Sequence, residues 1–196
     1  MPTLRGMRAC AVASIVAAVL LAACTPALLG PRNVPATTFT PRASFELSGR
    51  LSARHGSHAL SANFRWTHER ERDELDLNSP LGQTIARLSG DSAGVRLQMS
   101  DGRLELAHDW STLTTRALGW PLPVEGLAFW IQAVPRRGAP STVETGGDGM
   151  PAVLRQDGWV IVYQAFERGP DGVPRPQRLT LDYPDVELRI AIDAWR

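Results

Sequence analysis

The chain has 196 residues, a length that corresponds to about one domain with a core of its own. Its 21 basic residues, all arginine, nearly balance 20 acidic residues, and the formal net charge is +1 at pH 7. No arginine-rich block is present, which argues against nucleic acid as a partner and against electrostatic attachment to anionic lipid.

Residues 1–23 have the layout of a bacterial export signal. Arg5 and Arg8 precede an apolar core over 11–23, which is too short for a bilayer span of roughly 20 apolar residues. The core ends in Leu-Ala-Ala-Cys, which resembles the lipobox of bacterial lipoproteins. The resemblance implies cleavage before Cys24 and acylation of its thiol and its new amine. A simple secretory signal with a chance cysteine is the alternative.

Cys24 would be the one cysteine left after cleavage, because Cys10 lies in the removed segment. With its sulfur acylated, neither a disulfide nor a thiolate metal site is expected. Thr25 follows it, where an aspartate retains Gram-negative lipoproteins at the inner membrane, so the resemblance implies lipid anchoring at the outer membrane, facing the periplasm. Residues 24–43 are rich in proline and threonine and are predicted to form the lipidated N-terminus and a flexible, poorly packed tether.

From Ser44 onward, apolar residues alternate with polar ones, which predicts short β-strands separated by tight turns. Similar runs fill the C-terminal part, with short ones near Val143 and Val153. Together they predict an antiparallel meander of about eleven strands. In one C-terminal run we expect Trp159, Ile161 and Tyr163 on one face, and Val160, Val162 and Phe166 on the other.

The period changes between the two groups of strands, where two short helices are predicted. The apolar stripes are Leu113, Ala117 and Leu118 in the first, and Leu127, Trp130, Ile131 and Val134 in the second. Asp109 or Ser111 is the candidate cap of the first helix, and Pro135 stops the second. Both stripes can pack on the sheet as core, and the gap between a curved sheet and its helices is a natural ligand cavity.

The folded part resembles the LolB family of bacterial outer-membrane lipoproteins from about residue 45 to residue 195. The resemblance rests on F-R-W at 64–66, D-E-L-D-L-N-S-P-L-G-Q-T at 73–84, L-G-W-P-L-P-V-E-G-L-A-F-W-I at 118–131, D-G-W-V-I-V-Y at 157–163 and I-A-I-D-A-W at 190–195. It implies a mainly β domain over 44–196 with a few helices: an unclosed antiparallel β half-barrel of about eleven strands, covered by helices, that encloses a hydrophobic cavity.

In that family the cavity holds the acyl chains of another lipoprotein. The periplasmic carrier LolA delivers this cargo, and the receptor inserts it into the inner leaflet of the outer membrane without using a nucleotide. The resemblance therefore implies LolA, cargo lipoproteins and that leaflet as partners, for a monomer that needs no cofactor. A structural or adaptor lipoprotein that uses the half-barrel to bind a partner protein is the alternative.

Leu81, between Pro80 and Gly82, matches the exposed loop leucine that contacts or enters the membrane in the family. Ser79 stands where the family has asparagine, and a leucine folded back onto the core is the alternative. The candidate acyl-chain cavity residues are Phe64, Trp66, Leu75, Leu97, Trp130, Ile131, Ile161 and Leu181. Alternation does not say which face of a strand is inside, so these side chains could equally be plain core.

Residues 90–94 match G-x-S-x-G, the motif around the nucleophile of many esterases. That motif needs a strand-to-helix turn and a later acid and histidine. Here it lies between two strand-like runs and is interpreted as a hairpin turn; only His108 follows Ser92, with Asp101 as the one aspartate between them. We therefore expect no enzymatic activity, no catalytic residues and no metal site.

Overall fold

The computed structural model describes residues 36–196. The predicted signal peptide, Cys24 and the predicted tether up to residue 35 lie outside the described residues. Within the described range, no helix combines the length and the apolar character that a bilayer span requires.

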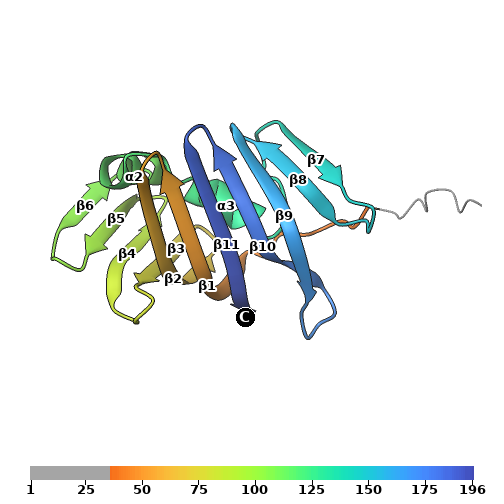
Figure 1. Ribbon diagram of the computed structural model, residues 1–196, viewed down its shortest axis with the longest axis horizontal. Helices are drawn as coiled ribbons and strands as arrows, with labels where there is room; N and C mark the ends of the chain where they lie inside the picture. Colours follow the sequence, from red (N-terminus) through yellow and green to blue (C-terminus); the bar gives the residue numbers. More distant parts are fainter. Residues whose placement is uncertain (1–35) are drawn as a thin grey trace, which may run out of the picture. The chain divides into compact units, whose positions relative to one another are not determined.

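Eleven strands form a single antiparallel sheet (Figure 1). They are β1 (Ser44–His55), β2 (His58–Glu69), β3 (Arg72–Asn78), β4 (Thr84–Asp91), β5 (Gly94–Met99), β6 (Leu104–Ala107), β7 (Ser141–Thr145), β8 (Pro151–Gln156), β9 (Trp159–Arg168), β10 (Pro174–Tyr183) and β11 (Val186–Trp195). Their spatial order is β6-β5-β4-β3-β2-β1-β11-β10-β9-β8-β7, in which β6 and β7 are the two edges and do not pair. The prediction of an unclosed antiparallel sheet of about eleven strands is therefore confirmed.

The alternation of residue types produces this sheet because successive side chains of a strand point to opposite faces. In β2, Ala62, Phe64 and Trp66 are buried, while the residues between them are half-buried or exposed. The pairing of β1 with β11 joins the N-terminal and C-terminal groups of strands, so one apolar face runs through both groups.

The predicted faces of β9 hold for Trp159, Ile161 and Tyr163, which are buried. The expectation for Phe166 is wrong. The register between β9 and β10 shifts near Arg178, and Phe166 packs against the core, with its ring centroid 5.7 Å from that of Tyr163. A register irregularity of this kind re-aims the side chains beyond it, which a strict alternation does not anticipate.

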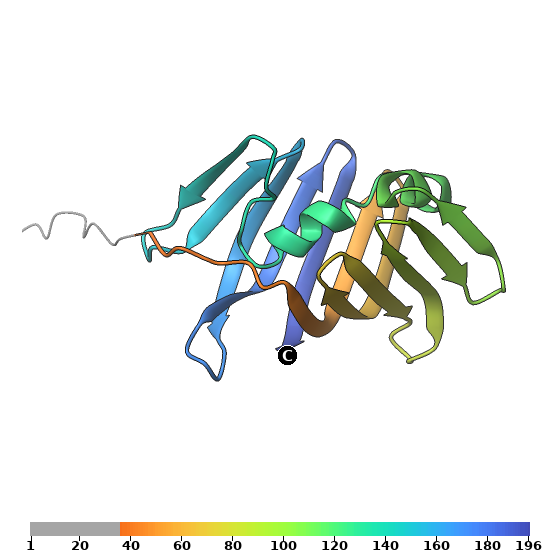
Figure 2. The ribbon, with the colours of Figure 1, turned by 180° about the vertical axis from the view of Figure 1, so that it is seen from behind.

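Two helices lie on one face of the sheet (Figure 2), α2 (Trp110–Leu118) beside β5 and β6, and α3 (Val124–Trp130) across the middle. Asp109, not Ser111, caps α2, because its carboxylate accepts a hydrogen bond of 2.7 Å from the Thr112 amide. This bond holds the pKa of Asp109 below its ordinary value. α3 ends at Trp130, although the predicted apolar stripe continues to Val134. Ala133, three residues after the end of α3, has a left-handed φ of 59°.

Residues 36–43 run beside the domain before β1 begins, and we call them the strap. The Thr37 amide donates to the Gly149 carbonyl at 2.7 Å, and the rings of Phe39 and Phe166 lie 5.8 Å apart. The Arg42 guanidinium pairs with Asp171 at 2.8 Å. This last part of the predicted tether is therefore packed against the domain, which differs from the expected poorly packed chain.

Candidate functional site

An apolar cavity lies between the sheet and the helices. The strands β1, β2, β3 and β11 form one wall, and the other wall comes from α2, α3 and the link between them, residues 119–123. All lining side chains are hydrophobic. The cavity has a volume of about 50 Å³, whereas ligand pockets typically measure about 300–1,000 Å³. The structure therefore shows a narrow, partly open cavity that is smaller than a typical ligand pocket.

A second hollow, of about 720 Å³, is larger but open and differently lined. Arg72, Arg96 and Arg116 contribute to it, and Arg96 lies next in sequence to the buried Val95 and Leu97, on the other face of β5. Acyl chains would leave these guanidinium groups without water or partners, which is costly. The smaller, apolar cavity is therefore the candidate site.

The eight residues predicted to line a cavity are all buried, and they belong to one hydrophobic core. Four of them line the cavity: Phe64, Trp66, Leu75 and Ile131. The other four lie in the core around it: Leu97, Trp130, Ile161 and Leu181.

Among the lining residues that were not predicted are Trp120 and Leu122, which lie in the link, and Leu188 and Ile190 of β11. The G-W-P-L-P segment at 119–123 is a usable signal for the link, because two large apolar residues, each followed by a proline, need a hydrophobic surface. The signal for β11 is weaker, because only the pairing of β1 with β11 brings that strand to the cavity.

One wall residue is fixed in orientation by a buried polar group. The indole N–H of Trp66 donates to Asp73 at 2.7 Å, and the ring nitrogen Nδ1 of His68 lies 2.8 Å from the same carboxylate oxygen. Asp73 is 5% exposed. Because a buried carboxylate is costly without partners, these bonds hold the Trp66 ring in place on the sheet side of the cavity.

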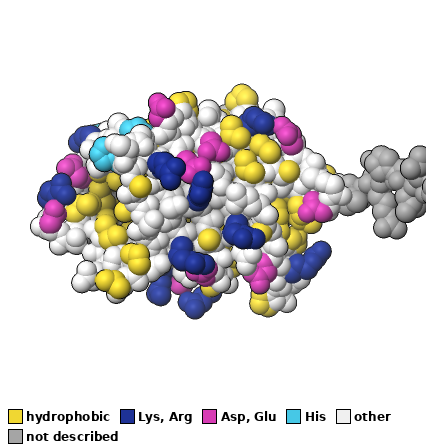
Figure 3. Space-filling view, viewed as in Figure 1, with side chains coloured by type: hydrophobic (Ala, Val, Ile, Leu, Met, Phe, Trp, Pro, Cys, Tyr) yellow, Lys and Arg dark blue, Asp and Glu magenta, His cyan; other side chains and the backbone are white. Residues whose placement is uncertain are grey.

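Leu81 occupies the turn between β3 and β4 and is 90% exposed, so it does not fold back onto the core. Ser79 holds the turn with three hydrogen bonds: its amide donates to the Gln83 carbonyl at 2.7 Å, its carbonyl accepts from Gly82 at 2.8 Å, and its hydroxyl accepts from the Gln83 amide at 3.2 Å. Gly82 takes a left-handed φ of 84°. In Figure 3, hydrophobic side chains reach the surface at the lower left, where this turn lies in Figure 1.

The G-x-S-x-G segment forms the tight turn between β4 and β5, as interpreted from the sequence. The Asp91 carboxylate accepts a hydrogen bond of 2.9 Å from the Ala93 amide inside this turn. The described residues contain no group of three or more histidine, cysteine, aspartate or glutamate side chains placed to hold a metal ion.

Comparison with known proteins gives a consistent picture. The family model described as "Outer membrane lipoprotein LolB" matches residues 43–195. A protein of Thiobacillus denitrificans named "Outer-membrane lipoprotein LolB" is 40% identical over 153 residues, which cover 78% of this chain and 80% of that protein. A protein of the same name from Chromobacterium violaceum is 37% identical over 181 residues, covering 91% and 94% of the two chains.

Among solved structures, a LolA superfamily protein from Nitrosomonas europaea matches with a TM-score of 0.49 and 8% sequence identity, over 81% of this chain and 87% of that one. A second solved structure is described as a "putative outer membrane lipoprotein-sorting protein domain from Vibrio parahaemolyticus". It matches with a TM-score of 0.48 and 7% identity, over 79% of this chain and 85% of that one.

Proposed function

The chain belongs to the LolB family of outer-membrane lipoproteins, and we propose that it is the receptor that accepts acylated lipoproteins from the periplasmic carrier LolA and inserts them into the outer membrane. The observation that carries the proposal is the cavity between sheet and helices, whose lining is entirely apolar. All residues that line the cavity belong to one chain, so the proposed function does not require a second copy.

An apolar cavity is what the cargo requires in the periplasm. Each CH₂ group that leaves water contributes about 0.8 kcal/mol, so the acyl chains of a lipoprotein cannot cross an aqueous space unprotected. Transfer needs no nucleotide if the receptor binds these chains more tightly than the carrier does and the bilayer binds them more tightly still. The free energy of the cargo then falls at each transfer, and the receptor only has to bind the acyl chains and release them.

Leu81 supplies a second contact with the membrane, besides the lipid on Cys24. Its side chain is 90% exposed on a turn that hydrogen bonds between Ser79, Gly82 and Gln83 close. Exposing a large apolar side chain in this way is unfavourable in water, and contact with the hydrocarbon of the leaflet removes this cost. The turn therefore brings the domain to the surface into which the cargo is released.

The adaptor function, the alternative from the sequence, is less well supported. A folded partner protein needs a broad accessible surface, whereas this apolar cavity is narrow and lies between the sheet and the helices. A narrow apolar cavity suits flexible hydrocarbon chains better than a protein surface.

Depletion of the protein in its own host tests the proposal. We expect lipoproteins to disappear from the outer-membrane fraction and lipoprotein bound to LolA to accumulate in the periplasm, and we expect both effects to reverse when the wild-type chain is restored. Normal delivery of lipoproteins in depleted cells, without accumulation on the carrier, would contradict the receptor function.

A further inference from the structure

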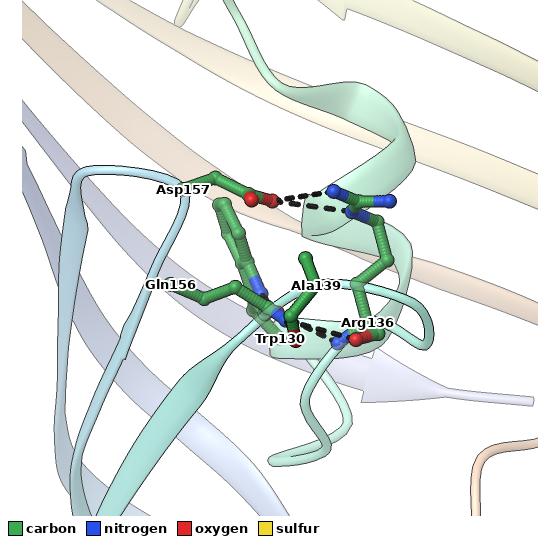
Figure 4. Close-up of polar contacts among 5 residues, drawn as sticks. All are labelled: Trp130, Arg136, Ala139, Gln156 and Asp157. Atoms are coloured by element: carbon green, nitrogen blue, oxygen red, sulfur yellow. Dashed lines mark hydrogen bonds and ion pairs between the residues drawn. The ribbon is translucent and has the colours of Figure 1, made fainter.

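The C-terminal end of α3 is fastened to the sheet by a buried side chain of β8. Gln156 is 3% exposed and makes four hydrogen bonds (Figure 4). Its Oε1 accepts from the indole N–H of Trp130 at 2.8 Å and from the amide of Arg136 at 2.7 Å. Its Nε2 donates to the carbonyls of Arg136 at 2.8 Å and Ala139 at 3.1 Å. The side-chain amide thus uses both donors and both acceptor positions on the end of α3 and the segment after it.

Two further contacts fasten the same end. The Tyr163 hydroxyl of β9 donates to the Trp130 carbonyl at 2.7 Å, and burial raises the pKa of this hydroxyl, which keeps its proton in place. From the strap, the Arg42 amide donates to Gln132 Oε1 at 2.8 Å, and Gln132 Nε2 donates back to the Arg42 carbonyl at 3.3 Å. The end of α3 is therefore bonded to β8, β9 and the strap.

The link in the helical layer has no such fastening to the sheet, although α2 before it is bonded to β6 through the Arg116 guanidinium, which donates to the Leu106 carbonyl at 3.0 Å. The hydrogen bonds of the link stay within that layer: the Gly119 amide donates to the Thr115 carbonyl at 2.9 Å, and the Leu122 amide donates to the Thr114 hydroxyl at 2.7 Å. In the described part of the chain, no hydrogen bond joins residues 119–123 to a strand. The link meets the sheet through the apolar side chains of Trp120 and Leu122, which line the cavity.

The C-terminal end of α3 and the link should respond differently to an apolar ligand. Acyl chains can replace the apolar contacts of the link at little cost, because hydrophobic contact has no fixed direction. They cannot replace the bonds of Gln156, since a buried donor or acceptor that loses its partner remains unsatisfied.

We propose that Gln156 is a positioning residue that makes the C-terminal end of α3 the fixed end of the helical layer, so that the cavity opens by displacement of the α2–α3 link. The identity of the ligand rests on the proposed function. The difference between the C-terminal end of α3 and the link is a property of the ligand-free protein. Gly119, in a left-handed conformation with φ of 83° at the end of α2, is the joint on the moving side.

Hydrogen exchange of the ligand-free, full-length lipidated protein in nanodiscs tests the asymmetry. We expect amides of residues 118–124 to exchange at least about tenfold faster than those of 131–136, the ratio that one or two lost hydrogen bonds produce. In Gln156→Met, which keeps the bulk but loses the bonds, 131–136 should lose about tenfold in protection while 118–124 stay unchanged. Equal protection of both segments in the wild type, or a uniform rise in exchange in the variant, would overturn the inference.

Gln98→Met is the matched control, because Gln98 is exposed on β5; its exchange pattern should equal that of the wild type. If Gln156→Met does not fold, Tyr163→Phe replaces it, since it removes one hydroxyl and leaves the ring. A selective loss of protection at 131–136 is again the expected result, and no loss there would contradict the proposal.

A triacylated cysteinyl peptide, added to the wild-type protein, tests the direction of opening. Exchange should change at 118–124 and stay unchanged at 131–136, and a change confined to 131–136 would overturn the inference. If the peptide does not bind, the proposed function is contradicted, and the ligand-free comparison still decides the role of Gln156.

Discussion

At the scale of single residues, Leu81 is exposed because of the turn that carries it. The Ser79 hydroxyl accepts a hydrogen bond from the Gln83 amide, so a side-chain oxygen helps to close the turn. The neighbouring Gly82 takes the left-handed conformation that a larger residue would resist. The exposure of Leu81 therefore depends on its neighbours, and replacing the leucine alone should leave the turn intact.

Replacing Leu81 with glutamate tests the membrane contact. We expect the free energy of unfolding to change by less than about 0.5 kcal/mol, since the side chain is exposed. Acceptance of lipoprotein from LolA should be largely kept, while insertion of the cargo into liposomes should fall, because a carboxylate does not enter hydrocarbon. Insertion is measured as the fraction of labelled lipoprotein that floats with the liposomes.

Leu106→Glu is the matched control for this prediction. Leu106 is also a leucine with an exposed side chain, 61% accessible, but it lies on the edge strand β6. Insertion by this variant should equal that of the wild type. Unchanged insertion by Leu81→Glu would remove the role of Leu81, and an equal loss in both variants would show that the effect is one of charge rather than of position.

At the scale of elements, local pattern predicted which segments are strands and helices, and non-local contacts decided where they end and which way they face. α3 stops at Trp130 although the apolar stripe continues to Val134, because the segment after it bonds to Gln156 of β8 instead of continuing the helix. Phe166 faces the core because the register with β10 shifts. Pro135 signals that α3 ends but not at which residue, and nothing within a few residues of Phe166 signals the register shift.

Gly49 is the element-scale feature that can be tested most simply. At this position β1 approaches β11 so closely that a Cβ atom would lie 2.1 Å from the Ala191 carbonyl oxygen and 3.0 Å from the Cα of Ile192. Backbone atoms cannot move aside without separating the strands. We therefore expect Gly49→Ala to lower the free energy of unfolding by about 1–3 kcal/mol, measured by urea denaturation.

Gly147→Ala is the control for this substitution. A Cβ at Gly147 would meet no atom within 4 Å, so its stability should stay within about 0.5 kcal/mol of the wild type. A Gly49→Ala protein as stable as this control would show that β1 and β11 can separate slightly at no cost, and that the sheet is less rigid there than the structure indicates.

At the scale of the whole molecule, the unclosed sheet, its helical cover and an apolar interior could be predicted, because alternation, spacing and the family motifs agree. The assignment of individual residues to the cavity could not. Trp130 and Ile131 are neighbours in sequence and both fully buried, yet Ile131 lines the cavity and Trp130 bonds to Gln156 outside it. Burial follows from local pattern, whereas the position of a void depends on how all the elements meet.

The strap also shows that contacts between distant elements can override what local composition predicts. Its composition predicts an extended tether, but Phe39 finds an aromatic partner in β9 and Arg42 bonds to Gln132 beyond α3. The chain between Thr37 and β1 is thereby joined to the same end of the helical layer that Gln156 holds. On the proposed account, this end of the helical layer is fixed, and the α2–α3 link moves to admit the cargo.

Transfer in a purified system tests the central claim most directly. The full-length lipidated protein is reconstituted into liposomes, and labelled lipoprotein bound to LolA is added without nucleotide. The account predicts that the label moves from the carrier to the liposomes, and that liposomes without the protein receive much less of it. Label that stays on LolA in the presence of the protein, or that reaches both kinds of liposomes equally, would contradict the account.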